Sequence, residues 1–136
     1  MASKQDADQK VKASGKRLIK SFEDLDVYRK AYALALEIHK LTLGFPKMEQ
    51  HALADQMRRA SKGICANIAE GFAKQRSSLP EFKRYLGMAI GSSDEMKVWL
   101  SFSQDLNYLP KKQGDRFKAE YVVVAKMLTG LSARWQ

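Results

Sequence analysis

The sequence predicts an all-α protein, an up-down-up-down four-helix bundle preceded by a disordered basic arm. Apolar residues recur at three- and four-residue steps in four segments of roughly 20 to 28 residues, which is the period of an amphipathic helix. Short polar connections separate the segments, so neighbouring helices are expected to run antiparallel. No segment alternates with the two-residue period of a strand. We expect one domain over residues 21–136 of the 136-residue chain, after an arm of residues 1–20.

The first helix is expected over residues 24–43. Acidic Glu23, Asp24 and Asp26 stand where a helix N-terminus favours negative charge. Gly44-Phe45-Pro46 ends the helix, because glycine and proline both interrupt the helical pattern. The predicted inward face consists of Tyr28, Ala31, Tyr32, Ala35, Ile38 and the Leu41-Thr42 pair.

The second helix is expected over residues 47–71. Gly71 is well placed as its C-terminal stop, since glycine commonly ends a helix in a left-handed conformation. Residues 74–77 then form a polar connection to the third helix. The inward stripe of the second helix consists of Leu53, Met57, Ala60, Ile64 and Ile68.

The third and fourth helices carry heptad-like seams. The third is expected to begin at Ser78, because Ser78-Leu79-Pro80-Glu81 fits a capping box with proline in the first turn, and to end near Leu106-Asn107. The fourth is expected over residues 112–131. Strict alternation of four- and three-residue steps implies nearly antiparallel neighbours at a shallow angle. The third-helix seam is Phe82, Leu86, Ala89, Ser93, Met96, Leu100 and Ser103, and the fourth-helix seam is Phe117, Tyr121, Val124, Leu128 and Leu131.

Two groups of polar residues lie outside the stripe of the second helix. At about 100° per residue, Arg58 and Lys62 fall toward its outer face. A separate flank has the pattern of a helix-contact or oligomer interface. A mid-helix glycine there, Gly63, indicates that another backbone comes close, because glycine costs about 1 kcal/mol relative to alanine in a helix. The flank consists of Gln56, Arg59, Gly63, Asn67 and Glu70.

The positive charge is concentrated in two places. The net charge is +9, and the excess of lysine and arginine falls in residues 1–20 and 58–84. Local positive charge favours a polyanion such as RNA or DNA, although lysine-rich helix faces also serve solubility alone. The residues predicted to contact phosphate are Arg58, Lys62, Lys74, Arg76, Lys83 and Arg84.

Several other classes of protein are not indicated. The only cysteine, Cys65, excludes an internal disulfide and is expected to be a small buried residue. Neither His39 nor His51 has a supporting catalytic motif, so we expect no enzyme, no cofactor and no metal site. No run of about 18 apolar residues and no secretory signal are found, which predicts a cytoplasmic protein without a membrane span.

Blocks of sequence distributed over residues 22–108 resemble a known family. They include Phe22-Glu23-Asp24-Leu25, Gln56-Met57-Arg58-Arg59-Ala60 and, most specifically, Asn67-Ile68-Ala69-Glu70-Gly71. The chain resembles the small bacterial four-helix-bundle proteins encoded within intervening sequences of large-subunit ribosomal RNA genes. The resemblance implies a four-helix protomer and a ring-like homopentamer. A related branch of the family is the accessory protein of diversity-generating retroelements. For that branch the resemblance implies a basic pentameric barrel that binds nucleic acid and a reverse transcriptase.

The chain departs from the family pattern at several positions. Tyr28 stands where tryptophan is common, Lys62-Gly63 replaces a small apolar residue and serine, and Asn107 replaces a usual glycine. Two functional hypotheses follow. The first is a non-enzymatic oligomeric bundle that binds RNA or other nucleic acid through basic surfaces. The alternative is a protein-interaction scaffold, such as a reverse transcriptase accessory protein, with no physiological nucleic-acid ligand.

Overall fold

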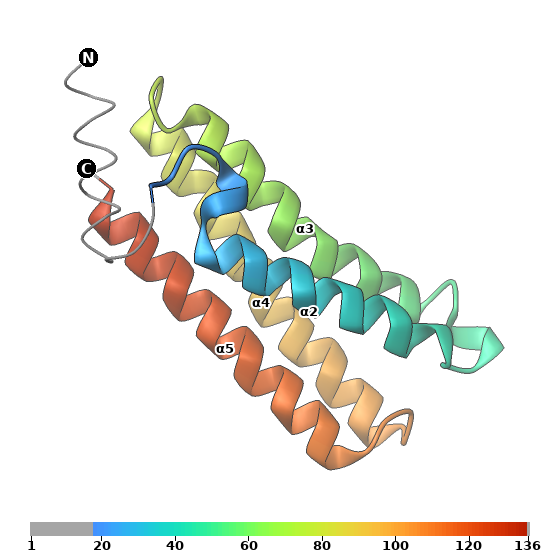
Figure 1. Ribbon diagram of the computed structural model, residues 1–136. Helices are drawn as coiled ribbons and strands as arrows, with labels where there is room; N and C mark the ends of the chain where they lie inside the picture. The colour runs from blue at the N-terminus through green and yellow to red at the C-terminus, as the bar shows by residue number, and fades with distance from the viewer. Residues whose placement is uncertain (1–17, 136) are drawn as a thin grey trace.

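The computed structural model describes residues 18–135, and this part of the chain is built from four long helices that run alternately up and down (Figure 1). They are α2 (Asp26–Leu43), α3 (Leu53–Lys74), α4 (Leu79–Asp105) and α5 (Lys111–Arg134). Two short 3-10 turns, η1 (Phe22–Asp24) and η2 (Lys47–Glu49), precede α2 and α3. No strand occurs in residues 18–135, so the predicted all-α four-helix bundle is confirmed. Most of the predicted basic arm, residues 1–17, lies outside the described residues.

The two heptad seams form the centre of the core, as predicted. All seven predicted positions of α4 are buried, and the five predicted positions of α5 are buried together with Gly114. The two buried serines of the α4 seam satisfy their own helix, since Ser93 Oγ donates to the Ala89 carbonyl at 3.0 Å and Ser103 Oγ to the Trp99 carbonyl at 2.8 Å. Serine is therefore compatible with this apolar seam because no hydroxyl is left unpaired there.

The buried face of α2 differs from the prediction. Tyr32, placed inward by the sequence pattern, is 50% exposed, whereas Leu34 is only 2% exposed. The predicted positions Ala31, Ala35, Ile38 and Thr42 are buried, and Val27 and Leu34 complete the buried face in place of the two tyrosines. The tyrosines of α2 lie at the border of the core, because a tyrosine ring can pack on its apolar body while its hydroxyl reaches water.

Both ends of α3 also differ from the prediction. The helix begins at Leu53, because residues 47–49 form the separate η2 turn after Pro46. Its other end passes through Gly71 to Lys74, so Gly71 is not a stop. A Cβ atom on Gly71 would lie 2.9 Å from Cβ of Tyr85 and 3.2 Å from the Phe82 carbonyl oxygen. Gly71 is therefore the point where α3 and α4 approach closely.

Gly63 does not mark a close backbone within the protomer. The nearest atom to a Cβ built on it is Ser92 Oγ at 4.0 Å, an ordinary van der Waals distance. The predicted close approach on α3 therefore occurs, but two turns further along the helix at Gly71.

Aromatic residues close both ends of the bundle. At one end Trp135 packs on Phe72 and Phe82, with ring centroids 5.8 and 5.6 Å apart, and its indole Nε1 donates to Gln75 Oε1 at 2.8 Å. At the other end the Tyr108 hydroxyl donates to Glu49 Oε2 at 2.7 Å. These contacts tie the connections to the core, so the connections of the bundle have defined positions.

Asn107 in the α4–α5 connection has a φ of 63°, a left-handed conformation. Asparagine tolerates this conformation better than most residues, and glycine tolerates it best. The asparagine that departs from the family pattern is therefore compatible with the turn.

Candidate nucleic-acid interface

Arg58 does not belong to the exposed basic surface, contrary to the prediction from its position on the helix. Its guanidinium is partly buried against the connection that follows α2, where Nη1 donates to Thr42 Oγ1 at 3.0 Å and Nη2 to the Gln50 carbonyl at 2.9 Å. The Gln50 amide in turn donates to the carbonyls of Thr42 and Phe45 at 2.9 and 3.0 Å. The Gln50 amide therefore caps the end of α2 by satisfying the Thr42 carbonyl, and Arg58 supports this cap by holding Gln50 and Thr42 together.

Four of the other predicted phosphate contacts gather around the short connection between α3 and α4. We call this group the basic corner, and it consists of Lys74, Arg76, Lys83 and Arg84. Within residues 18–135, neither Arg76 nor Lys83 makes an ion pair or side-chain hydrogen bond, and Arg76 is exposed. Ser78 accepts a hydrogen bond from the Glu81 backbone at 3.2 Å and so begins α4 immediately after the connection. The chain reversal is what brings the basic residues of two helices together.

The other two members of the basic corner have acidic partners on their own helices. Lys74 Nζ lies 3.6 Å from Glu70 Oε2. Arg84 donates to both carboxylate oxygens of Glu81 at 3.0 Å, and this hydrogen bonding holds the pKa of Glu81 below its usual range. Exposed pairs of this kind are worth about 0 to 1 kcal/mol. A phosphate, which forms strong charge-assisted bonds, is able to replace the carboxylates.

Lys62 lies away from the basic corner. Twelve residues of α3 separate it from Lys74, a distance of about 18 Å along the helix axis. Its ammonium lies 2.9 Å from Nδ1 of His39, which fixes the exposed side chain across the α2–α3 boundary. The six predicted phosphate contacts thus divide into a corner of four residues, a separate lysine and the capping Arg58.

The predicted interface flank of α3 is on the surface of the protomer. Arg59 pairs with Asp55 at 3.7 Å and Glu70 with Lys74, in both cases one turn away on the same helix. The side chains of Gln56 and Asn67 form no hydrogen bond with any residue in the described part of the chain. The polar groups of this flank are therefore accessible to another molecule, and their place in an oligomer interface stays a prediction.

A groove runs along the boundary of α2 and α3 and was not anticipated from the sequence. Its two parts, of about 510 and 500 Å³, share Phe22 and Ala69 in their lining, so they are adjacent. Lys62 stands at one end and Arg76 at the other. We call it the α2–α3 groove, and its middle is lined by the aromatic residues Phe22, Tyr28 and Tyr32 and the alanines Ala66, Ala69 and Ala73.

A sequence signal for this groove exists. Lys62, Ala66, Ala69 and Ala73 follow one another at steps of four, three and four residues, so they share one face of α3, and Arg76 follows three residues later in the connection. Small residues on the outward face of one helix do not by themselves predict a groove, because the second wall comes from another helix. Cys65 also lines the groove, and burial raises the pKa of its thiol to about 11, which leaves it protonated and unreactive near neutral pH.

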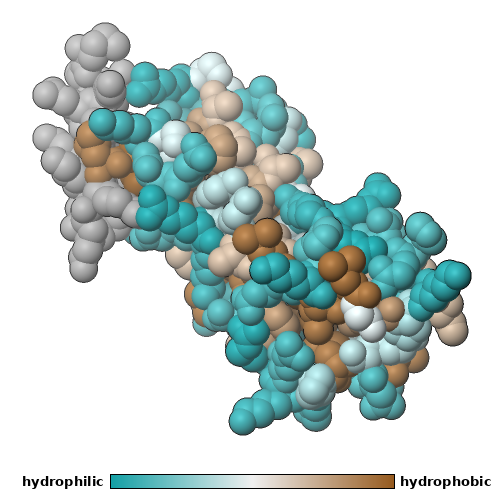
Figure 2. Space-filling view, turned by 45° about the vertical axis from the view of Figure 1, so that its right-hand side comes forward, coloured by the Kyte–Doolittle hydropathy of each residue, from teal (hydrophilic) through white to brown (hydrophobic). Residues whose placement is uncertain are grey.

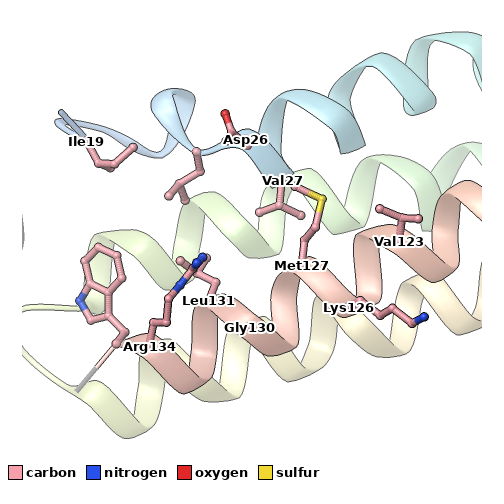
Figure 3. Close-up of a pocket in the computed structure, with 11 residues that line it drawn as sticks. Ile19, Asp26, Val27, Val123, Lys126, Met127, Gly130, Leu131 and Arg134 are labelled. Carbon is pink, nitrogen blue, oxygen red and sulfur yellow. The ribbon is translucent and has the colours of Figure 1, made fainter. Parts of the chain in front are cut away.

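A second groove, of about 450 Å³, lies between the start of α2 and the last turns of α5. Figure 3 shows Met127 reaching from α5 toward Val27 of α2 across this groove. The face presented in Figure 2 is mostly hydrophilic, with hydrophobic groups emerging in a few places between the polar side chains. The lining of this second groove is dominated by aliphatic side chains, with Asp26, Lys126 and Arg134 as its charged members.

In residues 18–135, no group of three or more histidine, cysteine, aspartate or glutamate side chains is placed to hold a metal ion. None of the helices in this part of the chain combines the length and the apolar character that crossing a bilayer requires.

Comparison with known proteins shows a family to which the chain belongs and solved structures that it resembles. A family model described as 23S rRNA-intervening sequence protein matches residues 23–130. No curated protein matches the chain. The crystal structure of a protein with unknown function from the S23 ribosomal protein family of Bacteroides thetaiotaomicron is similar, with a TM-score of 0.70 and 22% sequence identity over 79% of this chain and 95% of that one. At this identity the similarity concerns the fold.

Proposed function

Because the chain belongs to the 23S rRNA-intervening sequence protein family, we propose that it is a non-enzymatic, oligomeric helical bundle that binds RNA through the basic corner. The observation that carries the proposal is the pair of unpartnered cations, Arg76 within the α3–α4 connection and Lys83 in the first turns of α4. Contacts from such side chains to phosphate give affinity without sequence choice. The family description supports RNA as the polyanion.

The charge distribution of the bundle supports this location. At the opposite end of the molecule, the basic residues of α5 alternate with acidic ones, and Asp115 lies close to both Lys111 and Lys118, at 3.3 and 3.8 Å. In the basic corner four cations face two carboxylates, Glu70 and Glu81, which leaves a net charge of +2. A polyanion therefore meets the stronger positive potential at the corner.

The proposal is tested by the affinity of the full chain for a structured RNA at low and moderate salt. Binding through phosphate releases counterions, so the affinity should fall steeply as salt rises. An affinity that stays constant over this range would rule out phosphate contacts as the source of binding.

The oligomer is supported by an apolar row on the outward side of α4. Met88, Val98, Phe102 and Leu106 are all at least 44% exposed and are spaced so that they share one face of the helix. A Cβ on Gly91, in the same row, would have no atom within 4 Å, so a second chain has room to approach. Light scattering should give a molecular mass that is a multiple of the 15.4 kDa protomer mass, and a pentamer is expected from the family resemblance. A protomer mass at micromolar concentration would contradict the oligomer.

The same row favours a second candidate function, a protein-interaction scaffold whose partner is another protein. Exposed hydrophobic rows commonly mark protein–protein contacts. A partner that is recovered with the chain after nuclease treatment would support the scaffold, whereas a partner lost on nuclease treatment would support RNA binding.

A further inference from the structure

We infer that the α2–α3 groove is a binding site for single-stranded RNA, in which unpaired bases stack on Tyr32 and phosphates reach Lys62 and Arg76. This inference rests on the proposed RNA-binding function and extends it from the basic corner to a defined form of RNA. The two sites are adjacent, since Arg76 belongs to the basic corner and also lines the groove.

The aromatic wall of the groove has the geometry of a stacking platform. Tyr28 and Tyr32 are stacked, with ring centroids 5.9 Å apart and an interplanar angle of 30°. Phe22 packs edge-on against Tyr28 at 4.9 Å. Tyr32 is therefore held by its neighbour and still exposes half of its surface. A ring with a fixed orientation loses little further freedom when a base stacks on its open side.

The floor of the groove allows a ligand to come close. Ala66 and Ala73 are exposed methyl groups on the outward face of α3, and Ala69 lies between them. The other side chains of α3 that line the groove between Lys62 and Lys74 are Cys65 and Phe72, and both are half-buried. Planar bases are thus able to reach the aromatic wall without displacing a side chain.

The charges that line the groove fit a polyanion. Lys62 is exposed at one end and its ammonium is positioned by His39 at 2.9 Å, while Arg76 and Lys20 line the other end. No aspartate or glutamate is among the residues that line either part. Cations at both ends and aromatic rings between them are the features by which proteins bind single strands.

Single-stranded RNA fits this combination better than a duplex does. In a duplex the bases are paired and stacked on one another, so their faces are not open to a side chain. A duplex is therefore expected to contact the basic corner through phosphates and to leave Tyr32 untouched. This difference separates the groove from the corner experimentally.

The experiment compares a short unstructured oligoribonucleotide with its duplex, by fluorescence anisotropy with the full chain. Tyr32→Ala should weaken binding of the single strand about five- to one-hundredfold, the range expected for one base–aromatic stack. Binding of the duplex should change less than about twofold, because the duplex makes no stack there. Tyr32→Phe should bind like the unmodified protein. Leu43→Ala removes another exposed apolar side chain from α2, outside the groove, and should also have no effect.

A second variant tests the groove without changing Tyr28 or Tyr32. Ala66→Glu places a carboxylate on the exposed floor of the groove and should weaken binding of the single strand. Ala119→Glu makes the same change at an exposed position of α5 and should leave it nearly unchanged. Circular dichroism and thermal unfolding of each variant establish that it folds.

The outcomes separate the groove from the proposed function. If Tyr32→Ala and Ala66→Glu bind the single strand as tightly as the unmodified protein, while loss of Arg76 and Lys83 weakens binding, the groove inference is overturned and RNA binding at the corner stands. Equal weakening of single-strand and duplex binding by Tyr32→Ala would also overturn base stacking. If the unmodified protein binds neither RNA, the proposed function itself fails.

Discussion

Gly71 of α3 and Tyr85 of α4 approach so closely that a Cβ atom on the glycine would lie 2.9 Å from Cβ of the tyrosine. The Phe82 carbonyl oxygen, at 3.2 Å from the same position, belongs to the backbone and has no freedom to move aside. This contact sets the distance between the two helices whose connection carries the basic corner. A change at Gly71 therefore acts on the core and on the proposed RNA surface together.

Gly71→Ala is predicted to destabilise the protein by about 1 to 3 kcal/mol, because the added methyl group forces the two helices apart. Gly63→Ala is the matched control on the same helix, where the nearest atom would be 4.0 Å away. That change should be neutral or stabilise by up to about 1 kcal/mol through helix propensity. Denaturant unfolding of both variants measures the difference. A Gly71→Ala protein at least as stable as Gly63→Ala would contradict the close approach.

Arg58 and Arg59 are predicted to differ strongly in their effect on stability. Arg58→Ala removes the hydrogen bonds to Thr42 Oγ1 and the Gln50 carbonyl and should cost about 1 to 3 kcal/mol. Arg59→Ala removes only an exposed ion pair with Asp55 and should change stability by less than about 0.5 kcal/mol. Thermal unfolding of the two variants checks this, and equal losses would show that Arg58 has no capping role.

Replacement of Tyr121 and of Tyr108 by phenylalanine is predicted to change the stability of the protein in opposite directions. The Tyr121 hydroxyl is buried without a hydrogen-bond partner in the described part of the chain, and burial raises its pKa. Tyr121→Phe should therefore stabilise the protein by about 1 kcal/mol, since an unpaired buried hydroxyl is removed. Tyr108→Phe loses the 2.7 Å bond to Glu49 and should destabilise the protein slightly. Unfolding free energies that move in the same direction would refute this pair of assignments.

Cys65 is predicted to react with an alkylating reagent in a pH-dependent manner that reflects its burial. The thiolate is the reactive form, and burial raises the pKa of this thiol to about 11. Because a raised pKa favours the neutral thiol, the rate should continue to rise through pH 9 and 10. The rate for a cysteine peptide, with a pKa of about 8.5, should level off by about pH 10. The rate constants are measured by mass spectrometry, and a plateau near that of the peptide would show that the thiol is not buried as described.

The fold was predictable because the signals for it are redundant. In α4 every seam position is apolar or small and the steps never deviate, so Phe82 through Ser103 could be placed on one face without knowledge of their neighbours. Tyr32 was misplaced because a tyrosine counts as apolar in a periodic pattern, although its hydroxyl allows it to lie at the border of a core.

The site was less predictable because it depends on contacts between segments. A helical projection gives the direction of the Arg58 backbone but not the reach of its guanidinium, whose partners are 8 and 16 residues away in the sequence. A single sequence does not distinguish a glycine that ends a helix from a glycine at which two helices cross. The pattern therefore predicts a helix end at Gly71. The α2–α3 groove has walls from two helices. Its tyrosines and alanines lie far apart in the sequence and form a groove only after α2 packs on α3.

The central claim is that RNA binds at the basic corner through phosphate contacts, and the salt dependence of RNA affinity tests it most directly. The variant Arg76→Ala/Lys83→Ala removes the two unpartnered cations, and Lys47→Ala/Lys112→Ala removes two exposed lysines at the opposite end of the bundle. The slope of log affinity against log salt should decrease in magnitude by about one to two units for the first variant. It should stay unchanged for the second. Equal slopes for both variants and the unmodified protein would contradict the assignment of the corner.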